Sequence, residues 1–208
     1  MTGTLLLAGS VTRGDVTVTG CRPDHLQALT DKLVECGVVT VIGDDWIRVK
    51  ADGITGGTDI LTAPYPGFPT DLQPQMVGFL CTCPGTSVVE ESIFNARFSY
   101  VNELARMGAE VKVTMESNAA VIKGPKQLSG APVEAPDIRA GAGLVVAALA
   151  AAGETEIIGL EYIDRGYDRL EEMLSELGGQ VQRSSGVTPL VEPAGFFETS
   201  EYPRVSAS

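Results

Sequence analysis

Five charged residues stand where this sequence would change from a strand or loop to a helix. Asp71 follows a proline-rich approach and opens an apolar stretch, while Arg97 lies in a link between a strand-like and a helix-like segment. Asp137 and Arg139 share a second such junction, and Arg165 lies at a third. Arginine guanidinium groups bind carboxylate and phosphate oxygens through paired hydrogen bonds. If these residues meet in the fold, they predict a site for a small anion.

Each of these residues also has a plainer structural explanation. Asp71 could be only a helix cap, because a carboxylate at a helix start accepts hydrogen bonds from free N–H groups. Arg97 could be a surface arginine beside two core aromatic residues, Phe94 and Phe98. The neighbouring Asp–Arg pairs could be exposed salt bridges, which contribute little to stability.

Composition excludes several classes of function. The chain has 208 residues and a net charge of −12, so a basic nucleic-acid-binding surface is not expected. An anionic ligand must instead be held by a local cluster of arginines. The longest apolar run, residues 144–152, is too short to span a bilayer, and the apolar N-terminal patch lacks the basic residues of a signal peptide.

Cysteine and histidine usage predicts neither a metal site nor a cofactor. Cys81 and Cys83 have no second pair of ligands, and His25 is the single histidine of the chain. The spacing of Gly141 and Gly143 fits no phosphate-binding loop. Because four cysteines in 208 residues imply no disulfide framework, we expect a protein of the reducing cytoplasm.

A repeat of about 70 residues organises the chain. Gly37, Gly108 and Gly178 each end a helix-like stretch, where a left-handed residue is needed. The strand-like segments that follow them are 38–42, 109–113 and 179–182. Such a repeat favours the functional interpretation of the charged junctions, because symmetry should bring them to one end of the domain, where sites usually form.

The repeat extends to the segments around a second set of glycines, Gly14, Gly85 and Gly153. Each precedes a β-prone run and follows an apolar stretch of helical length. These stretches are 5–11, 72–83 and 140–152, and further strand-like segments are 46–50 and 119–123. Other predicted helices are amphipathic, with apolar faces formed by Leu26, Leu29, Leu33 and Cys36, and by Leu170, Met173, Leu174 and Leu177. Three similar units therefore predict a common helical core with sheets outside.

The unit boundaries follow from the repeat. We expect a partial first unit at 1–57, a second unit at 58–131, a third at 132–185 and a tail at 186–208. The first unit begins at the opening of a helix, without the strand that should precede it. The sequence thus predicts that 208 residues are not the whole protein.

At its charged junctions the sequence resembles the UDP-N-acetylglucosamine 1-carboxyvinyltransferases, a family of enolpyruvyl transferases. The resemblance runs from about Thr2 to Arg183. The motifs that carry it are Phe68-Pro69-Thr70-Asp71-Leu72-Gln73, Phe94 with Arg97-Phe98, Glu103-Leu104 with Arg106-Met107-Gly108-Ala109, Lys126 with Leu128-Ser129-Gly130-Ala131, Asp137-Ile138-Arg139-Ala140, and Asp164-Arg165-Gly166-Tyr167. Asn95-Ala96 departs from the Glu-Asn that the family often has there, and the tail leaves the family pattern.

The resemblance implies a fold and a reaction. The fold is an α/β (α+β) inside-out barrel of repeated βαβαββ units, like that of EPSP synthase, with one unit truncated here. The reaction joins phosphoenolpyruvate to the 3′-hydroxyl of UDP-N-acetylglucosamine and releases phosphate, the first committed step of peptidoglycan synthesis and cell wall biogenesis. No metal or other cofactor is implied, and no nucleic acid or membrane partner.

The resemblance also implies roles for eight residues. Asp71 takes the proton of the sugar hydroxyl, and Asp137 is a second acid near the reacting carbon. The uridine-sugar pocket includes Thr70, Ile93 and Phe94, and the clamp for the phosphoenolpyruvate anion is formed by Arg97, Arg139 and Arg165.

The family's other domain supplies a lysine and a loop cysteine that also bind phosphoenolpyruvate, and no residue of this sequence fills those roles. We therefore expect the chain to be the C-terminal part of such an enzyme, without turnover on its own. The alternative is a non-catalytic remnant that binds a UDP-sugar or serves as an interaction module.

Overall fold

The computed structural model describes residues 1–114, 116 and 118–184. The first group of elements is α1 (Thr2–Val11), β1 (Asp15–Thr19), η1 (Pro23–Leu26), α2 (Gln27–Glu35), β2 (Val39–Ile42) and β3 (Trp46–Lys50). The second is β4 (Ile60–Leu61), η2 (Thr70–Leu72), α3 (Gln73–Leu80), β5 (Gly85–Glu90), α4 (Val101–Arg106), β6 (Glu110–Thr114) and β7 (Ala119–Gly124). The third is β8 (Pro132–Glu134), α5 (Ile138–Ala148), β9 (Glu156–Ile158), α6 (Leu160–Asp164) and α7 (Leu170–Glu176). The second group has the order βαβαββ. The unit boundaries drawn from the sequence stay a prediction, and the tail at 186–208 lies outside the described residues.

Each group of elements forms its own small sheet. The first sheet has the antiparallel order β1-β3-β2, and the second has the order β4-β5-β7-β6, in which β4 runs parallel to β5. Strands β8 and β9 form a parallel pair. Alternate residues turn one face of each sheet inward, so that Ile47 and Val49 of β3 are fully buried while Arg48 between them is exposed.

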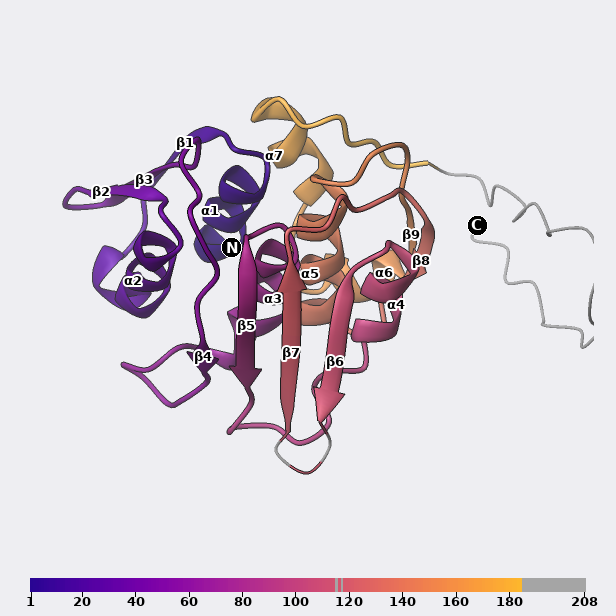
Figure 1. Cartoon of the computed structure of the whole chain (residues 1–208). Coiled ribbons are helices and arrows are strands. Elements are labelled where there is room, and N and C mark those ends of the chain that lie inside the picture. The colour runs from indigo at the N-terminus through magenta and orange to yellow at the C-terminus, as the bar shows by residue number, and fades with distance from the viewer. Residues whose placement is uncertain (115, 117, 185–208) are drawn as a thin grey trace, which may run out of the picture.

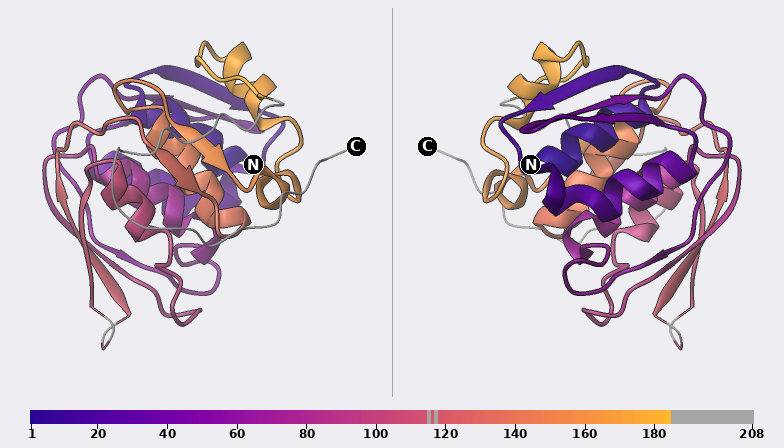
Figure 2. Two further views of the ribbon diagram at one scale, coloured as in Figure 1. Left: turned by 90° about the vertical axis from the view of Figure 1, so that its right-hand side faces the viewer. Right: turned by 90° about the vertical axis from the view of Figure 1, so that its left-hand side faces the viewer.

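Helices α1, α3 and α5 lie in the middle of the molecule with strands around them (Figures 1 and 2). Their sequences are apolar on nearly every side, as expected of helices enclosed in a core. Every residue of α3 is buried, and Leu6 of α1, Met76 of α3 and Leu144 of α5 are fully buried. Burying each such side chain contributes roughly 1.5–3 kcal/mol. The predicted helical core with sheets outside is confirmed.

The glycines that end the predicted helices adopt the left-handed conformation. The backbone φ angles of Gly37, Gly108 and Gly178 are 89°, 87° and 92°. A residue with a Cβ is strained there, so the chain turns out of α2, α4 and α7 at these points.

The strand expected at 179–182 is absent from the structure. This segment stays against its own helix: the amide of Gly179 donates to the carbonyl of Leu174, and Ser175 Oγ donates to the carbonyl of Val181, each at 2.8 Å. Arg183 then forms ion pairs with Asp164 and Glu171. Because these local contacts hold the segment beside α7, its backbone is not aligned with β8 or β9.

The four cysteine thiols are free, and three of them are buried. Cys36, Cys81 and Cys83 are at most 1% exposed, whereas Cys21 is half-buried. Burial raises the pKa of Cys81 to about 12, so its reactive thiolate is scarce at neutral pH. We expect a thiol reagent at about pH 8 to modify Cys21 alone in the folded chain and all four cysteines in guanidinium chloride. Mass spectrometry of tryptic peptides measures this, with Cys21→Ser as the control, and rapid modification of a second thiol in the folded chain would contradict the packing described.

Candidate functional site

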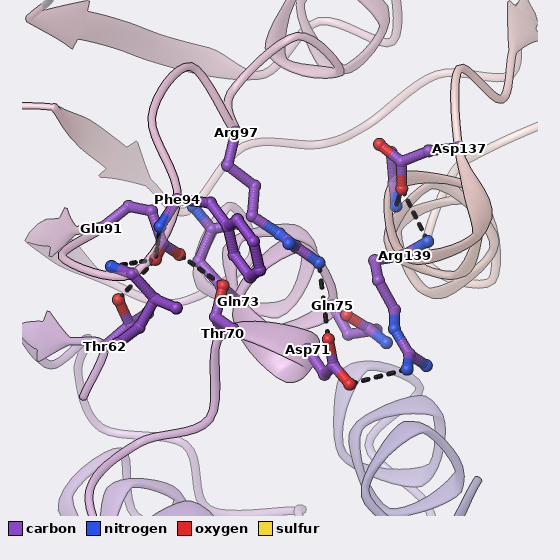
Figure 3. Close-up of polar contacts among 12 residues, drawn as sticks. Thr62, Thr70, Asp71, Gln73, Gln75, Glu91, Phe94, Arg97, Asp137 and Arg139 are labelled. Atoms are coloured by element: carbon purple, nitrogen blue, oxygen red, sulfur yellow. Dashed lines mark hydrogen bonds and ion pairs between the residues drawn. The ribbon is translucent and has the colours of Figure 1, made fainter. Parts of the chain in front are cut away.

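Asp71 lies between two arginines that come from different elements (Figure 3). It stands in η2 at the start of α3, and its Oδ2 accepts a hydrogen bond from Arg139, in the first turn of α5, at 2.6 Å. Its Oδ1 lies 3.5 Å from a guanidinium nitrogen of Arg97, in the segment between β5 and α4. The Asp71 side chain is 52% exposed, whereas those of Arg97 and Arg139 are 17% and 30% exposed. Two partly buried cations therefore meet at an accessible carboxylate, within a chain that is acidic as a whole.

Asp137 caps helix α5. Its Oδ1 accepts hydrogen bonds from the backbone amides of Arg139 at 2.8 Å and Ala140 at 2.9 Å. A cap of this kind contributes roughly 1 kcal/mol to helix stability. Asp137 thus acts as a helix cap and not as the salt-bridge partner of Arg139, whose ion pair is with Asp71, and the cap also fixes the turn from which Arg139 reaches Asp71. Its role as an acid stays a prediction.

Arg165 contacts a different group. It follows α6, and its guanidinium carbon lies 5.3 Å from the centre of the Tyr162 ring, a cation–π contact. The adjoining turn packs closely at the start of α5: a Cβ added at Gly166 would lie only 2.3 Å from the Ile138 side chain. The structure therefore brings Arg97 and Arg139 together at Asp71, while Arg165 sits on a neighbouring turn with its side chain over Tyr162.

The three residues expected in the uridine-sugar pocket are joined through one carboxylate that the sequence reasoning missed. Glu91 directly follows β5 and is only 3% exposed. It accepts hydrogen bonds from the Thr70 hydroxyl and from the backbone amides of Ile93 and Phe94. Strand alternation is the signal that could have found it, because Ser87 and Val89 point inward and Glu91 is the next residue in that series.

A buried polar network lies beneath Asp71. The Tyr100 hydroxyl donates to Oε1 of Gln73 at 2.9 Å, and burial raises the pKa of this phenol well above its usual range, so it stays a neutral donor. Two residues further along α3, Nε2 of Gln75 donates to the Tyr167 hydroxyl at 3.0 Å and to Thr4 of α1 at 3.3 Å. The start of α3, and with it Asp71, is therefore tied to α1, to α4 and to the turn after α6.

The described part of the chain contains no group of three or more histidine, cysteine, aspartate or glutamate side chains placed to bind a metal ion. Of the helices in the described ranges, none is long and apolar enough to cross a membrane. Among the described side chains, the charged groups of the site are the carboxylates and guanidinium groups named above.

The chain is similar to proteins of known families. The family model for EPSP synthase (3-phosphoshikimate 1-carboxyvinyltransferase) matches residues 1–174. A UDP-N-acetylglucosamine 1-carboxyvinyltransferase of Desulfofundulus thermocisternus is 50% identical over 182 residues, which are 88% of this chain and 74% of that protein. One of Anaeromyxobacter sp. strain Fw109-5 is 48% identical over 87% of this chain, but the match spans only 42% of the longer relative.

Solved structures share the fold. The enolpyruvyl transferase NikO from Streptomyces tendae superposes with a TM-score of 0.77 at 25% identity, over 86% of this chain and 42% of that one. EPSP synthase from Acinetobacter baumannii, at 19% identity, superposes with a TM-score of 0.66 over 88% of this chain and 43% of its own length. The inside-out α/β architecture expected from the sequence is thus confirmed. The chain belongs to the UDP-N-acetylglucosamine 1-carboxyvinyltransferase family of enolpyruvyl transferases.

Proposed function

We propose that this chain contributes part of an active site that transfers the enolpyruvyl group of phosphoenolpyruvate to the 3′-hydroxyl of UDP-N-acetylglucosamine. The observation that carries the proposal is Asp71 held between Arg97 and Arg139. A proton acceptor beside two anion-binding groups supplies both functions that the reaction needs from this side of the site. The names of the curated relatives support the same activity.

The reaction is an addition followed by an elimination. The sugar oxygen bonds to C2 of phosphoenolpyruvate while C3 gains a proton, and then C3 loses a proton as the bond from C2 to the phosphate oxygen breaks. Asp71 takes the hydroxyl proton as the oxygen attacks. Asp137 serves as the second acid near the reacting carbon.

The arginines hold the phosphoenolpyruvate carboxylate and phosphate and stabilise charge in the tetrahedral intermediate. The Asp71 oxygens contact Arg97 and Arg139, and taking up a proton weakens both contacts because it removes the negative charge. A bound phosphoenolpyruvate anion offers both guanidinium groups another partner. Binding of phosphoenolpyruvate is thereby coupled to the release of Asp71 from its ion pairs with the two arginines. Arg165 reaches the same anion by leaving the face of Tyr162.

The nucleotide sugar contacts Thr70, Ile93 and Phe94 in this proposal. Ile93 and Phe94 are 38% and 51% exposed, which leaves them accessible to a ligand. A second, N-terminal domain supplies the lysine and the loop cysteine, in keeping with a match that spans 42% of the Anaeromyxobacter relative.

Phosphate release tests the proposal. The joined enzyme for this test is the part of the Anaeromyxobacter relative that precedes the matched region, fused to this chain. We expect the joined enzyme to release phosphate from phosphoenolpyruvate and UDP-N-acetylglucosamine and to form the enolpyruvyl product, seen by mass spectrometry. We expect no phosphate above background from the 208-residue chain alone.

Two outcomes would contradict this expectation. Turnover by the chain alone would show that the second domain is dispensable. A joined enzyme that folds and binds UDP-N-acetylglucosamine, yet releases no phosphate while the intact relative does, would favour the alternative of a non-catalytic UDP-sugar-binding or interaction remnant.

A further inference from the structure

Glu91 is a buried carboxylate whose partners are all neutral donors. It is 3% exposed, and no lysine or arginine in the described ranges forms an ion pair with it. Burying an ionised carboxylate without compensation is strongly unfavourable. Hydrogen bonds to the charged oxygens provide that compensation, and each is stronger than a bond between neutral groups. Four hydrogen-bond donors surround Glu91, so its negative charge is stabilised by those four groups and not by a cation.

The four donors belong to the segments that carry the proposed sugar pocket (Figure 3). Oε1 accepts from the Thr62 hydroxyl at 2.8 Å and from the backbone amides of Ile93 at 2.9 Å and Phe94 at 3.1 Å. Oε2 accepts from the Thr70 hydroxyl at 2.9 Å. One side chain therefore fixes the start of η2 and the turn after β5 relative to each other.

A second set of contacts holds the same turn from its other side. The amide of Ser92 donates to the Thr62 hydroxyl oxygen at 2.9 Å. The side-chain amide of Asn118 donates to the carbonyl of Glu91 at 2.6 Å and to that of Phe94 at 2.9 Å. The backbone around Phe94 is thus pinned at several points, although the Phe94 ring itself is half exposed.

The Phe94 ring connects this turn to the charged centre. The guanidinium carbon of Arg97 lies 5.0 Å from the centre of the ring, and Arg97 reaches Asp71 at 3.5 Å. A shift of the turn would therefore move the ring, the guanidinium group that rests on it, and the contact to Asp71.

We propose that Glu91 is the positioning residue of the nucleotide-sugar pocket. Its carboxylate holds Thr70, Ile93 and Phe94 in the arrangement that binds the sugar nucleotide, and through the Phe94 ring it sets the direction of Arg97. Glu91 does not touch the reacting atoms. This inference rests on the proposed function, and it predicts that loss of the carboxylate weakens binding of UDP-N-acetylglucosamine much more than it slows turnover at saturation.

Glu91→Gln tests the inference with a side chain of the same size. The new amide NH₂ group must face at least one of the four donors, so the turn loses hydrogen bonds while the packing volume is kept. In the joined enzyme we expect the KM for UDP-N-acetylglucosamine to rise about tenfold or more, with kcat within about threefold. In the 208-residue chain we expect amide hydrogen exchange at Ile93 and Phe94 to accelerate about tenfold, with exchange in α1 and α5 unchanged.

Glu90→Gln is the matched control, because it removes the same charge from an adjacent, exposed side chain. It should leave both KM and exchange unchanged. If Glu91→Gln does not fold, Thr62→Val provides the second variant. It keeps the side-chain shape while it removes one donor to Glu91 and the acceptor of the Ser92 amide, both of which hold the same turn. It should change KM and exchange in the same direction by a smaller factor.

Two results would overturn the inference. One is Glu91→Gln with unchanged KM and unchanged exchange at Ile93 and Phe94. The other is faster exchange throughout α1, α3 and α5 with KM and kcat altered alike, which a purely structural role would produce. If the joined enzyme of native sequence does not bind UDP-N-acetylglucosamine, the proposed function fails, while the exchange data still show whether Glu91 orders the turn.

Discussion

Asp71→Asn is expected to lower phosphate release by the joined enzyme by about a thousandfold, the middle of the range for loss of a general base. Asparagine has nearly the same shape but cannot accept the hydroxyl proton. Its amide would also turn a donor toward one of the two arginines, both of which now face a carboxylate oxygen. A continuous phosphate assay with both substrates at saturation measures the effect on kcat.

The same substitution should affect stability and phosphoenolpyruvate binding very differently. The Asp71 side chain is 52% exposed, and ion pairs at such sites contribute less than about 1 kcal/mol, so we expect little change in Tm. Loss of the negative charge leaves Arg97 and Arg139 free for the substrate anion, so the KM for phosphoenolpyruvate should stay the same or fall.

A control variant separates this effect from a general loss of charge. The Asp168 side chain is 90% exposed, and within the described part of the chain its ion-pair partner is its neighbour Arg169, at 4.0 Å. Asp168→Asn should leave kcat unchanged. A kcat for Asp71→Asn within about tenfold of the native value would remove Asp71 from the chemical step, because general-base catalysis contributes at least about a hundredfold.

The sequence predicted those features of the fold that depend on local rules. Gly37, Gly108 and Gly178 mark helix ends because only a left-handed residue fits there, and this requirement can be read from residue type and spacing. The burial of α1, α3 and α5 could be predicted in the same way from their apolar stretches, since a helix that is apolar on all sides must be buried.

Features that depend on distant partners could not be predicted in this way. The repeat, in which a strand-like segment follows each helix-ending glycine, suggested a strand after Gly178. A strand also needs a neighbour, however, and local contacts to α7 hold that segment instead. Similarly, no spacing rule shows that Arg165 rests on Tyr162, or that Gln73 and Gln75 face hydroxyl groups inside the core.

The candidate site likewise combines residues that could be predicted from the sequence with one that could not. Placing Asp71, Arg97 and Arg139 at one end of the domain followed from repeat symmetry, because equivalent junctions of repeated units lie at equivalent places. Glu91 was missed because a glutamate after a strand is usually exposed, as its neighbour Glu90 is. Its importance comes from four donors that three separate segments bring to it.

Gly143→Ala is expected to destabilise the 208-residue chain by about 1–3 kcal/mol, as overpacking of a core does. In an isolated helix the same change would be stabilising by up to about 1 kcal/mol. Here a Cβ at Gly143 would lie 2.7 Å from the backbone carbon of Pro74 and 2.8 Å from its Cβ, so α5 could not approach α3 as it does. Denaturation by urea, followed by circular dichroism, measures the change in the free energy of unfolding.

Gly141→Ala on the same helix is the matched control for Gly143→Ala. Its Cβ would meet the Ile163 side chain at 2.6 Å, and an isoleucine side chain can rotate away where a backbone cannot. We therefore expect a smaller loss of stability, and a Gly143→Ala chain at least as stable as the native one would refute the close packing of α3 on α5. Pro74 lies three residues after Asp71, and Gly143 four residues after Arg139. Forcing these two helices apart should consequently lengthen the contact between Asp71 and Arg139 and reduce turnover in the joined enzyme, which ties the packing of the core directly to the geometry of the site.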